Sequence, residues 1–102
     1  MASVWTWESE NKNMKKDFQN VVKSFREETE DMTAKAMMTH QQEVKGTATI
    51  NCGFGEKSID RAEKMKNFPP FVAWCEAYGI KTVTVERVKY YNNFFSQVRV
   101  TY

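Results

Sequence analysis

The sequence VTVERVKYYNNFFSQVRVTY, residues 83–102, contains two segments of alternating apolar and polar residues separated by two asparagines. Because asparagine tolerates the left-handed backbone that a two-residue turn requires, Asn92 and Asn93 predict the turn of a β-hairpin. In the register that this turn sets, Val85 lies opposite Val100 on one face. The other face carries polar pairs: Thr84 with Thr101, and Glu86 with Arg99. Such a division is typical of a two-stranded ribbon that buries one side.

The tip of this hairpin predicts a binding surface, because it gathers aromatic and basic side chains. In the same register Tyr90 lies opposite Phe95 and Tyr91 lies opposite Phe94, so each face receives two rings. A ribbon normally buries one face, and at least one aromatic pair is therefore expected to meet water, another element or a partner. The predicted partner-binding residues are Arg87, Lys89, Tyr90, Tyr91, Asn92, Asn93, Phe94 and Phe95.

Two helical segments are expected before the hairpin. Apolar residues at helical spacing predict a first helix over residues 12–38; the alternative ends this helix earlier and places a strand over residues 32–39. Alanine, lysine and methionine are poor strand formers and favour the longer helix. A second helix is expected to start at Ser58, a candidate N-cap. It breaks at Pro69-Pro70, because proline donates no backbone hydrogen bond and restricts the residue before it.

Strands are expected on either side of the first helix. Residues 43–54 alternate as a half-buried strand, with Ile50 and Phe54 on the same face. Residues 4–7, VWTW, alternate over a shorter stretch and predict an edge strand. Its two tryptophans would share one face, because strand side chains repeat every two residues.

Together these elements predict an α+β fold. Two helices, the second kinked at Pro69-Pro70, pack on one face of a three- to four-stranded antiparallel sheet that ends in the C-terminal β-hairpin. Residues 1–102 are expected to form a single domain. If residues 32–39 were a strand, the order β-α-β-β-α-β-β would approach a ferredoxin-like arrangement, which hosts many functions and would not settle this one.

Composition restricts the class of protein. The chain has 102 residues, of which 41% are hydrophobic and 14% aromatic, and this argues against disorder. A net charge of +2 gives no global field that would attract nucleic acid or membrane. Cys52 and Cys75 form no C-x-x-C pattern and have apolar neighbours, which indicates reduced, buried thiols in a cytosolic protein. One disulfide in a secreted chain is the alternative.

The location predicted from the sequence is cytoplasmic. The first residues lack the basic and apolar regions of a signal peptide, and no apolar run approaches the roughly 18–20 residues that span a bilayer. We therefore expect no membrane partner.

Residues 52–58, CGFGEKS, link a predicted strand to a predicted helix, as a phosphate-binding loop does. Glu56 stands where such a loop needs glycine, and its carboxylate would repel phosphate. A tight turn is therefore expected, with at most weak anion binding at Ser58.

Other clusters of reactive side chains lack the spacing of a known site. Glu27 and Asp31 are i, i+4 neighbours, but a solvated helix face explains them better than a divalent ion does. His40 could pair with Cys52 or Cys75, yet the spacing matches no zinc pattern or catalytic motif. The sequence thus predicts no catalytic residue, no metal and no cofactor.

These observations predict a small non-catalytic protein that docks a macromolecular partner, first of all a protein, through the aromatic hairpin and modulates or inhibits it. A small inhibitor or adaptor fits this description, including one that a phage or virus makes against a host factor. A second copy of the chain, giving a homodimer, is a further partner consistent with the same surface. The alternative function is single-stranded nucleic-acid binding, in which the same rings stack on bases beside Arg87, Lys89 and Arg99.

Overall fold

One five-stranded sheet organises the described part of the chain. The structure, a computed structural model, describes residues 5–7, 12–44 and 46–102. Its strands are β1 (Trp5–Trp7), β2 (Gln41–Val44), β3 (Thr47–Phe54), β4 (Thr82–Tyr90) and β5 (Asn93–Thr101). They lie in the order β1-β2-β3-β5-β4. The edge strand β1 runs parallel to β2, and the other neighbours are antiparallel.

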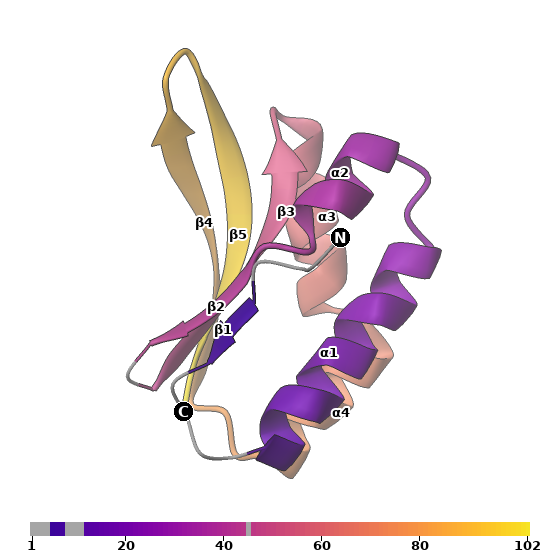
Figure 1. The fold of residues 1–102 in the computed structure, drawn as a ribbon, viewed down its shortest axis with the longest axis vertical. Coiled ribbons are helices and arrows are strands. Elements are labelled where there is room, and N and C mark those ends of the chain that lie inside the picture. Colours follow the sequence, from indigo (N-terminus) through magenta and orange to yellow (C-terminus); the bar gives the residue numbers. More distant parts are fainter. Residues whose placement is uncertain (1–4, 8–11, 45) are drawn as a thin grey trace.

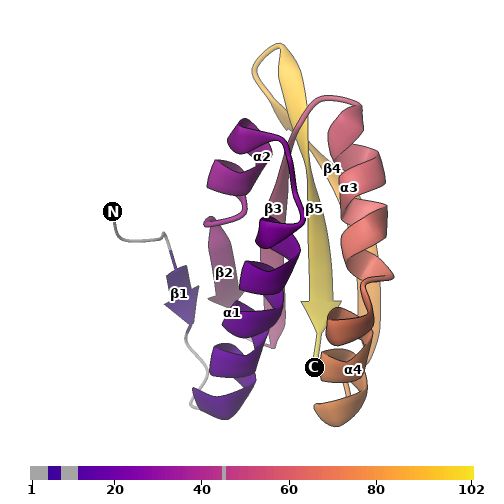
Figure 2. The same cartoon turned by 90° about the vertical axis from the view of Figure 1, so that its right-hand side faces the viewer.

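The helices of the described residues all cover the same face of this sheet (Figure 1, Figure 2). They are α1 (Lys12–Glu27), α2 (Met32–Met37), α3 (Lys57–Lys66) and α4 (Pro69–Ala77). The predicted class is therefore confirmed: the fold is α+β, with helices on one face of a largely antiparallel sheet that ends in a C-terminal hairpin. The tip of that hairpin extends beyond the ends of α2 and α3 (Figure 2).

One cluster of buried side chains lies between the helices and the sheet. From the helices it includes Met14, Phe18, Val22, Phe25, Phe71 and Trp74, and from the sheet Ala48, Ile50, Val98 and Val100. The apolar face of α1 meets α4, where the Phe18 ring lies 4.8 Å from that of Trp74. The Trp74 indole also donates a hydrogen bond to the Met14 carbonyl at 3.1 Å. Burial of these large apolar surfaces supplies most of the stabilisation of such a fold.

The predicted first helix over residues 12–38 is in fact two helices. α1 ends at Glu27 and α2 begins at Met32, so the helical character was predicted correctly and the break was not. Asp31 has an extended backbone, and its carboxylate accepts a hydrogen bond from the Ala34 N–H at 3.0 Å. This N-cap starts a new helix, because it satisfies an amide that the first turn leaves without a partner. The alternative strand over residues 32–39 is wrong.

The predicted strand over residues 43–54 is a hairpin made of β2 and β3. The chain reverses through Gly46, whose φ of +83° favours glycine. The element order β-α-β-β-α-β-β is therefore present, with β2 as the strand that follows the first helical region, counting α1 and α2 together. The arrangement is nevertheless not ferredoxin-like, because β1 and β2 are direct neighbours, whereas a split βαβ unit has another strand between them.

The break at the proline pair is confirmed. α3 ends at Lys66 and α4 starts at Pro69. Proline fits the first turn of a helix because the N–H groups there have no partner within the helix. The prediction that Ser58 caps the second helix is wrong. α3 begins one residue earlier, and the buried Ser58 hydroxyl instead donates to the Gly55 carbonyl and lies within hydrogen-bond distance, 2.8 Å, of the Ser96 hydroxyl in β5.

The C-terminal hairpin turns one residue earlier than predicted. Tyr91 and Asn92 form the turn, and Val85 lies opposite Val98 instead of Val100. The partners are thus shifted by two residues. Because side chains alternate with a period of two, this shift keeps the paired strand residues on their predicted faces. The burial pattern in the sequence therefore could not distinguish the two registers. The predicted pairs Tyr90–Phe95 and Tyr91–Phe94 are nevertheless wrong: Phe95 lies opposite Val88, Phe94 lies opposite Lys89, and Tyr91 stands in the turn.

Polar contacts on the face away from the helices match the observed register. The Glu86 carboxylate accepts hydrogen bonds from the Gln97 amide and from Arg99 Nε, each at 2.9 Å. The predicted ion pair between Glu86 and Arg99 therefore forms, although the two residues are diagonal rather than opposite. Thr101 pairs with Thr82 instead of Thr84.

The predicted N-terminal strand is present as β1, at the opposite edge of the sheet from β4. Residue 4 and the side chains of the two tryptophans lie outside what the structure describes, so the shared tryptophan face remains a prediction. Within the described ranges, none of the helices has the length and apolar character needed to cross a bilayer.

Candidate functional site

The sheet face that the helices leave open is polar over most of its length. Its side chains alternate along the strands with buried residues such as Ile50 and Val98, so they point away from the helices. They include Gln42, Thr49, Asn51, Thr84, Glu86, Gln97 and Arg99. This open face ends in an aromatic surface at the hairpin tip.

A β-bulge in β3 builds part of that aromatic surface. Asn51 pairs with Gln97 and Phe54 pairs with Phe95, so three steps along β3 match two steps along β5. Gly53 lies inside the irregularity, with a φ of +106°. The extra residue rotates the following side chain to the other face. Phe54 therefore lies on the open face, and its predicted place on the face of Ile50 is wrong.

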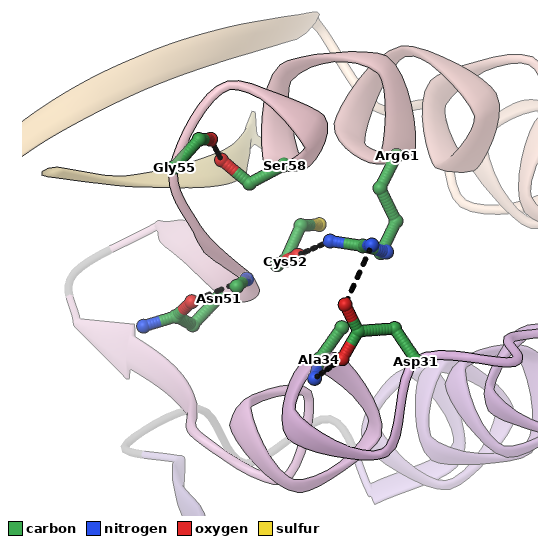
Figure 3. A network of polar contacts seen from close by, with 8 residues as sticks. Asp31, Ala34, Asn51, Cys52, Gly55, Ser58 and Arg61 are labelled. Atoms are coloured by element: carbon green, nitrogen blue, oxygen red, sulfur yellow. Dashed lines mark hydrogen bonds and ion pairs between the residues drawn. The ribbon is translucent and has the colours of Figure 1, made fainter.

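A polar network from α2 and α3 holds the bulge in place (Figure 3). Arg61 Nη1 of α3 donates to the Cys52 carbonyl at 3.0 Å, and its Nη2 lies 3.5 Å from an Asp31 carboxylate oxygen. The Asn51 side-chain oxygen accepts from the Gly53 N–H at 2.8 Å. The hydrogen bond from Ala34 lowers the pKa of Asp31, and the Arg61 charge lowers it further. The carboxylate therefore stays ionised beside the guanidinium.

Four rings form what we call the aromatic cluster: Phe54, Tyr90, Tyr91 and Phe95. The Phe54 ring lies 5.7 Å from Tyr90 and 6.0 Å from Phe95, and Tyr90 meets the edge of Tyr91 at 4.7 Å. Two members remain largely in solvent, since Tyr90 is 51% exposed and Tyr91 is 81% exposed. The cluster therefore combines two half-buried rings, Phe54 and Phe95, with two exposed ones, Tyr90 and Tyr91.

The other predicted site residues lie elsewhere on the tip. Phe94, Arg87 and Lys89 share the opposite face of the ribbon, where the Arg87 guanidinium lies 5.1 Å from the centre of the Phe94 ring. Asn92 belongs to the turn, and Asn93 begins β5; both are exposed. The structure thus separates the basic residues of the tip from most of the aromatic cluster, which the sequence had grouped together.

Sequence reasoning missed Phe54 as a site residue. The available signal was Gly53, because an isolated glycine within a strand often marks a bulge. Its effect on Phe54 depends on pairing with Phe95 of β5, 41 residues further along the chain, and cannot be inferred from the local sequence.

The open face is hollowed beside the aromatic cluster, over a volume of about 310 Å³. Its lining residues are Met37, His40, Gln42, Thr49, Asn51, Phe54, Tyr90, Phe95 and Gln97. The rings form one side of this hollow, and side-chain amides of the sheet form its floor.

The cysteines and the histidine are not brought together. Cys52 is fully buried on the helix side of the sheet, whereas His40 lines the hollow on the open face. Burial raises the pKa of Cys52 to about 12 and that of Cys75 to about 11, so both remain neutral thiols near pH 7. A reactive cysteine needs the opposite shift. Both are free, as the sequence indicated, but Cys75 is only half-buried.

The described residues contain no group of three histidine, cysteine or acidic side chains placed to hold a metal ion. Asp31, one residue of the i, i+4 acidic pair with Glu27, is turned toward Arg61 and caps α2. Its partner Glu27 is the last residue of α1. The buried Ser58 hydroxyl is engaged with Ser96, so it is not presented to an anion.

Comparison of the chain with protein-family models, with curated proteins and with solved structures gave no match. We therefore infer function from the surface itself, and above all from the aromatic cluster and the hollow beside it.

Proposed function

We propose that this protein acts by binding: it docks a protein partner through the aromatic cluster and thereby modulates or inhibits that partner. The observation that carries the proposal is Tyr91. Its backbone has a φ of 55°, in the left-handed region, and its ring is 81% exposed. For a residue with a side chain, this conformation costs about 1–2 kcal/mol relative to the right-handed one. Glycine or asparagine would relieve most of that cost, so the ring is retained for something other than folding.

The neighbouring rings support Tyr91 as a contact residue. The Tyr90 ring packs against it in a T-shaped arrangement with the ring centres 4.7 Å apart, and the Phe54 ring lies 5.7 Å from that of Tyr90. A supported ring loses little conformational freedom on binding, which favours affinity. Tyrosine is also among the residues that most often dominate the binding energy of protein interfaces.

Charge placement favours a protein partner over single-stranded nucleic acid. A nucleic-acid groove combines stacking rings with basic groups along one path. Here Arg87 and Lys89 lie on the opposite face from Tyr90 and Phe95, and Arg99 on the open face is paired with Glu86. Nucleic-acid binding is therefore the competing outcome of the experiment below.

We propose binding without catalysis, in a cytoplasmic setting. The two free thiols are consistent with a reducing compartment, although they do not identify one. Both thiols have raised pKa values, which makes them poor nucleophiles and supports a partner that is affected by occupation of its surface rather than by reaction with a cysteine.

The test is affinity capture with matched variants. Wild type, Tyr91→Asn and Met32→Ala are immobilised and exposed to lysate of the cells that make the protein, with and without nuclease. Met32 is 75% exposed on α2, away from the hairpin tip, so its variant controls for loss of any exposed apolar side chain. We expect a protein that is retained by wild type and Met32→Ala, lost with Tyr91→Asn, and unaffected by nuclease.

Other outcomes separate the alternatives. Capture that nuclease abolishes and that weakens steeply with salt would favour nucleic acid, because each neutralised phosphate releases counterions. Capture of the chain itself would indicate a homodimer. If the folded Tyr91→Asn variant retained everything that wild type retains, the aromatic cluster would not be the docking surface.

A further inference from the structure

The hollow on the open face has the size of a site for one small group. Its volume of about 310 Å³ lies at the lower end of the range for ligand pockets. Phe54, Tyr90 and Phe95 form its aromatic side and belong to the aromatic cluster. His40 and Met37 lie on its rim, at the end of α2 and the start of β2. An occupant would therefore lie directly beside the proposed docking surface.

The lining of the hollow selects against a charged occupant. Its residues are amides, a threonine, a methionine, rings and His40, and it contains no lysine, arginine, aspartate or glutamate. A phosphate or an ionised side chain would lose its hydration there without gaining an opposite charge. A flat, uncharged ring can instead be desolvated at little cost and packs against other rings.

Two side-chain amides on the floor offer one donor and one acceptor. The Asn51 oxygen already accepts from the Gly53 N–H at 2.8 Å, which leaves its Nδ2 group as the donor directed to other partners. The Gln97 nitrogen already donates to Glu86 at 2.9 Å, which leaves its Oε1 atom as the acceptor. Asn51 and Gln97 lie directly opposite each other on β3 and β5. These existing bonds also fix the orientation of both amides.

We propose that this hollow receives the side chain of a tyrosine or tryptophan from the partner protein. The ring packs against Phe54 and Phe95, and its O–H or N–H donates to Gln97 Oε1. A tyrosine oxygen additionally accepts from Asn51 Nδ2. The inference rests on the proposed function in taking the partner to be a protein, and it specifies the chemistry of the group that the partner inserts. Aromatic side chains that fill pockets are the usual anchors of such interfaces.

The test uses isolated side-chain analogues, so it needs no identified partner. The folded protein is titrated with N-acetyl-tyrosinamide and N-acetyl-tryptophanamide while amide and side-chain NMR resonances are followed. N-acetyl-leucinamide controls for general apolar contact, and adenosine for a nucleobase without phosphate. We expect saturable shifts at Asn51, Gln97 and Phe54 with the two aromatic amides, at millimolar concentrations.

Asn51→Asp is the decisive variant. The aspartate can still accept from the Gly53 N–H, so the bulge is kept, but the donor into the hollow is lost. Affinity for N-acetyl-tyrosinamide is expected to fall about 10-fold, as for loss of one hydrogen bond. Thr84→Val, also on the open face but outside the hollow lining, is the matched control and should bind like wild type.

The inference is overturned if the aromatic amides shift no hollow resonance, if the leucine analogue binds equally well, or if Asn51→Asp binds like wild type. Tighter binding of adenosine would also overturn it and point to nucleic acid. The outcome is separable from the docking proposal. If capture of the partner depends on Tyr91 but the aromatic amides shift no hollow resonance, only this inference is removed. If the aromatic amides do shift the hollow resonances but capture does not depend on Tyr91, only docking through the tip is removed.

Discussion

The sheet contains two hairpins that reverse the chain with different residues. The β2–β3 hairpin passes through Gly46 at a φ of +83°, and the β4–β5 hairpin passes through Tyr91 at a φ of 55°. Glycine adopts this backbone without steric cost, whereas tyrosine does not. The first turn is therefore explained by folding alone. The second carries an exposed ring at a backbone position where glycine or asparagine would be less strained, and this difference is the main reason to propose a function for the tip.

The same contrast extends along the strands. β3 is irregular, and its bulge at Gly53 is held by Arg61 from the helix layer. β4 and β5 pair regularly from Thr82 to the turn. Gly53 of β3 thus allows the close approach of Arg61 and Ala34 at the bulge, and the regular ribbon of β4 and β5 presents side chains to solvent.

The largest change in stability is expected from a substitution at the β3 bulge. In Gly53→Ala the new Cβ would lie 3.1 Å from Arg61 Nη1 and 3.3 Å from the Ala34 Cβ, in a left-handed backbone. We expect the free energy of unfolding to fall by about 3 kcal/mol, measured by denaturant titration. Gly55→Ala is the matched control: its φ is +80°, but nothing lies within 4 Å, so a loss of about 1 kcal/mol is expected. Equal losses at both glycines would show that the close packing of the bulge does not matter.

A smaller loss is expected at the first turn. Gly46→Ala combines a φ of +83° with a Cβ 3.3 Å from the Tyr102 carbonyl. Unfolding free energy should decrease by about 1.5 kcal/mol in the same assay. If the variant were as stable as wild type, the two turns would tolerate side chains equally, and Tyr91 would no longer stand out.

At the second turn a substitution is expected to raise the free energy of unfolding instead of lowering it. Tyr91→Asn relieves the left-handed backbone but loses the edge contact with Tyr90, and a net gain of about 0.5 kcal/mol should follow. Thermal or denaturant unfolding measures it. A variant that is more stable yet no longer captures the partner would sharpen the contrast between the hairpins. A clear loss of stability would instead make Tyr91 a structural residue.

The smallest effect is expected in the pH dependence of stability, through Glu86 on the ribbon of β4 and β5. Hydrogen bonds from Gln97 and from Arg99 lower the pKa of Glu86 below its usual value of 4.5. The folded state therefore binds its proton less readily than the unfolded state, so the stabilisation is present above about pH 4.5 and is lost as pH falls through the folded value.

The Glu86 side chain is 37% exposed, and solvent screening limits the effect to less than about 0.5 kcal/mol. Urea titrations between pH 6 and 3 should show a shallower decline for Glu86→Gln than for wild type. Identical slopes would mean that the ion pair adds nothing to the ribbon.

Sequence reasoning was accurate where the pattern is local. The apolar spacing of residues 14–25 fixes one face of α1, and the proline pair ends one helix and starts the next without help from distant residues. It was inaccurate where two patterns compete. Residues 43–54 alternate without interruption, so the turn at Gly46 was hidden within an apparently continuous strand.

The candidate site shows the same division. Tyr90, Tyr91, Phe94 and Phe95 are recognisable at the tip from sequence, and the contact between Arg87 and Phe94 joins two of the predicted binding residues. Phe54 was not recognisable, and neither was the hollow, because both depend on which strands become neighbours. The two-residue register error has the same origin, since a shift by one full alternation leaves the burial of every side chain unchanged.

By itself the sequence determined the apolar face of α1, the break at the proline pair and the presence of an aromatic β-hairpin after α4, because periodicity and turn chemistry act over a few neighbouring residues. Only the tertiary structure decided which rings gather into the aromatic cluster, because Phe54 changes face at the bulge and Tyr91 stands in the turn beside Tyr90. The bulge at Gly53 is held by Arg61 of α3, and β5 lies between β3 and β4 in the sheet. These are long-range contacts, and their geometry exists only once the helices and the sheet have packed together.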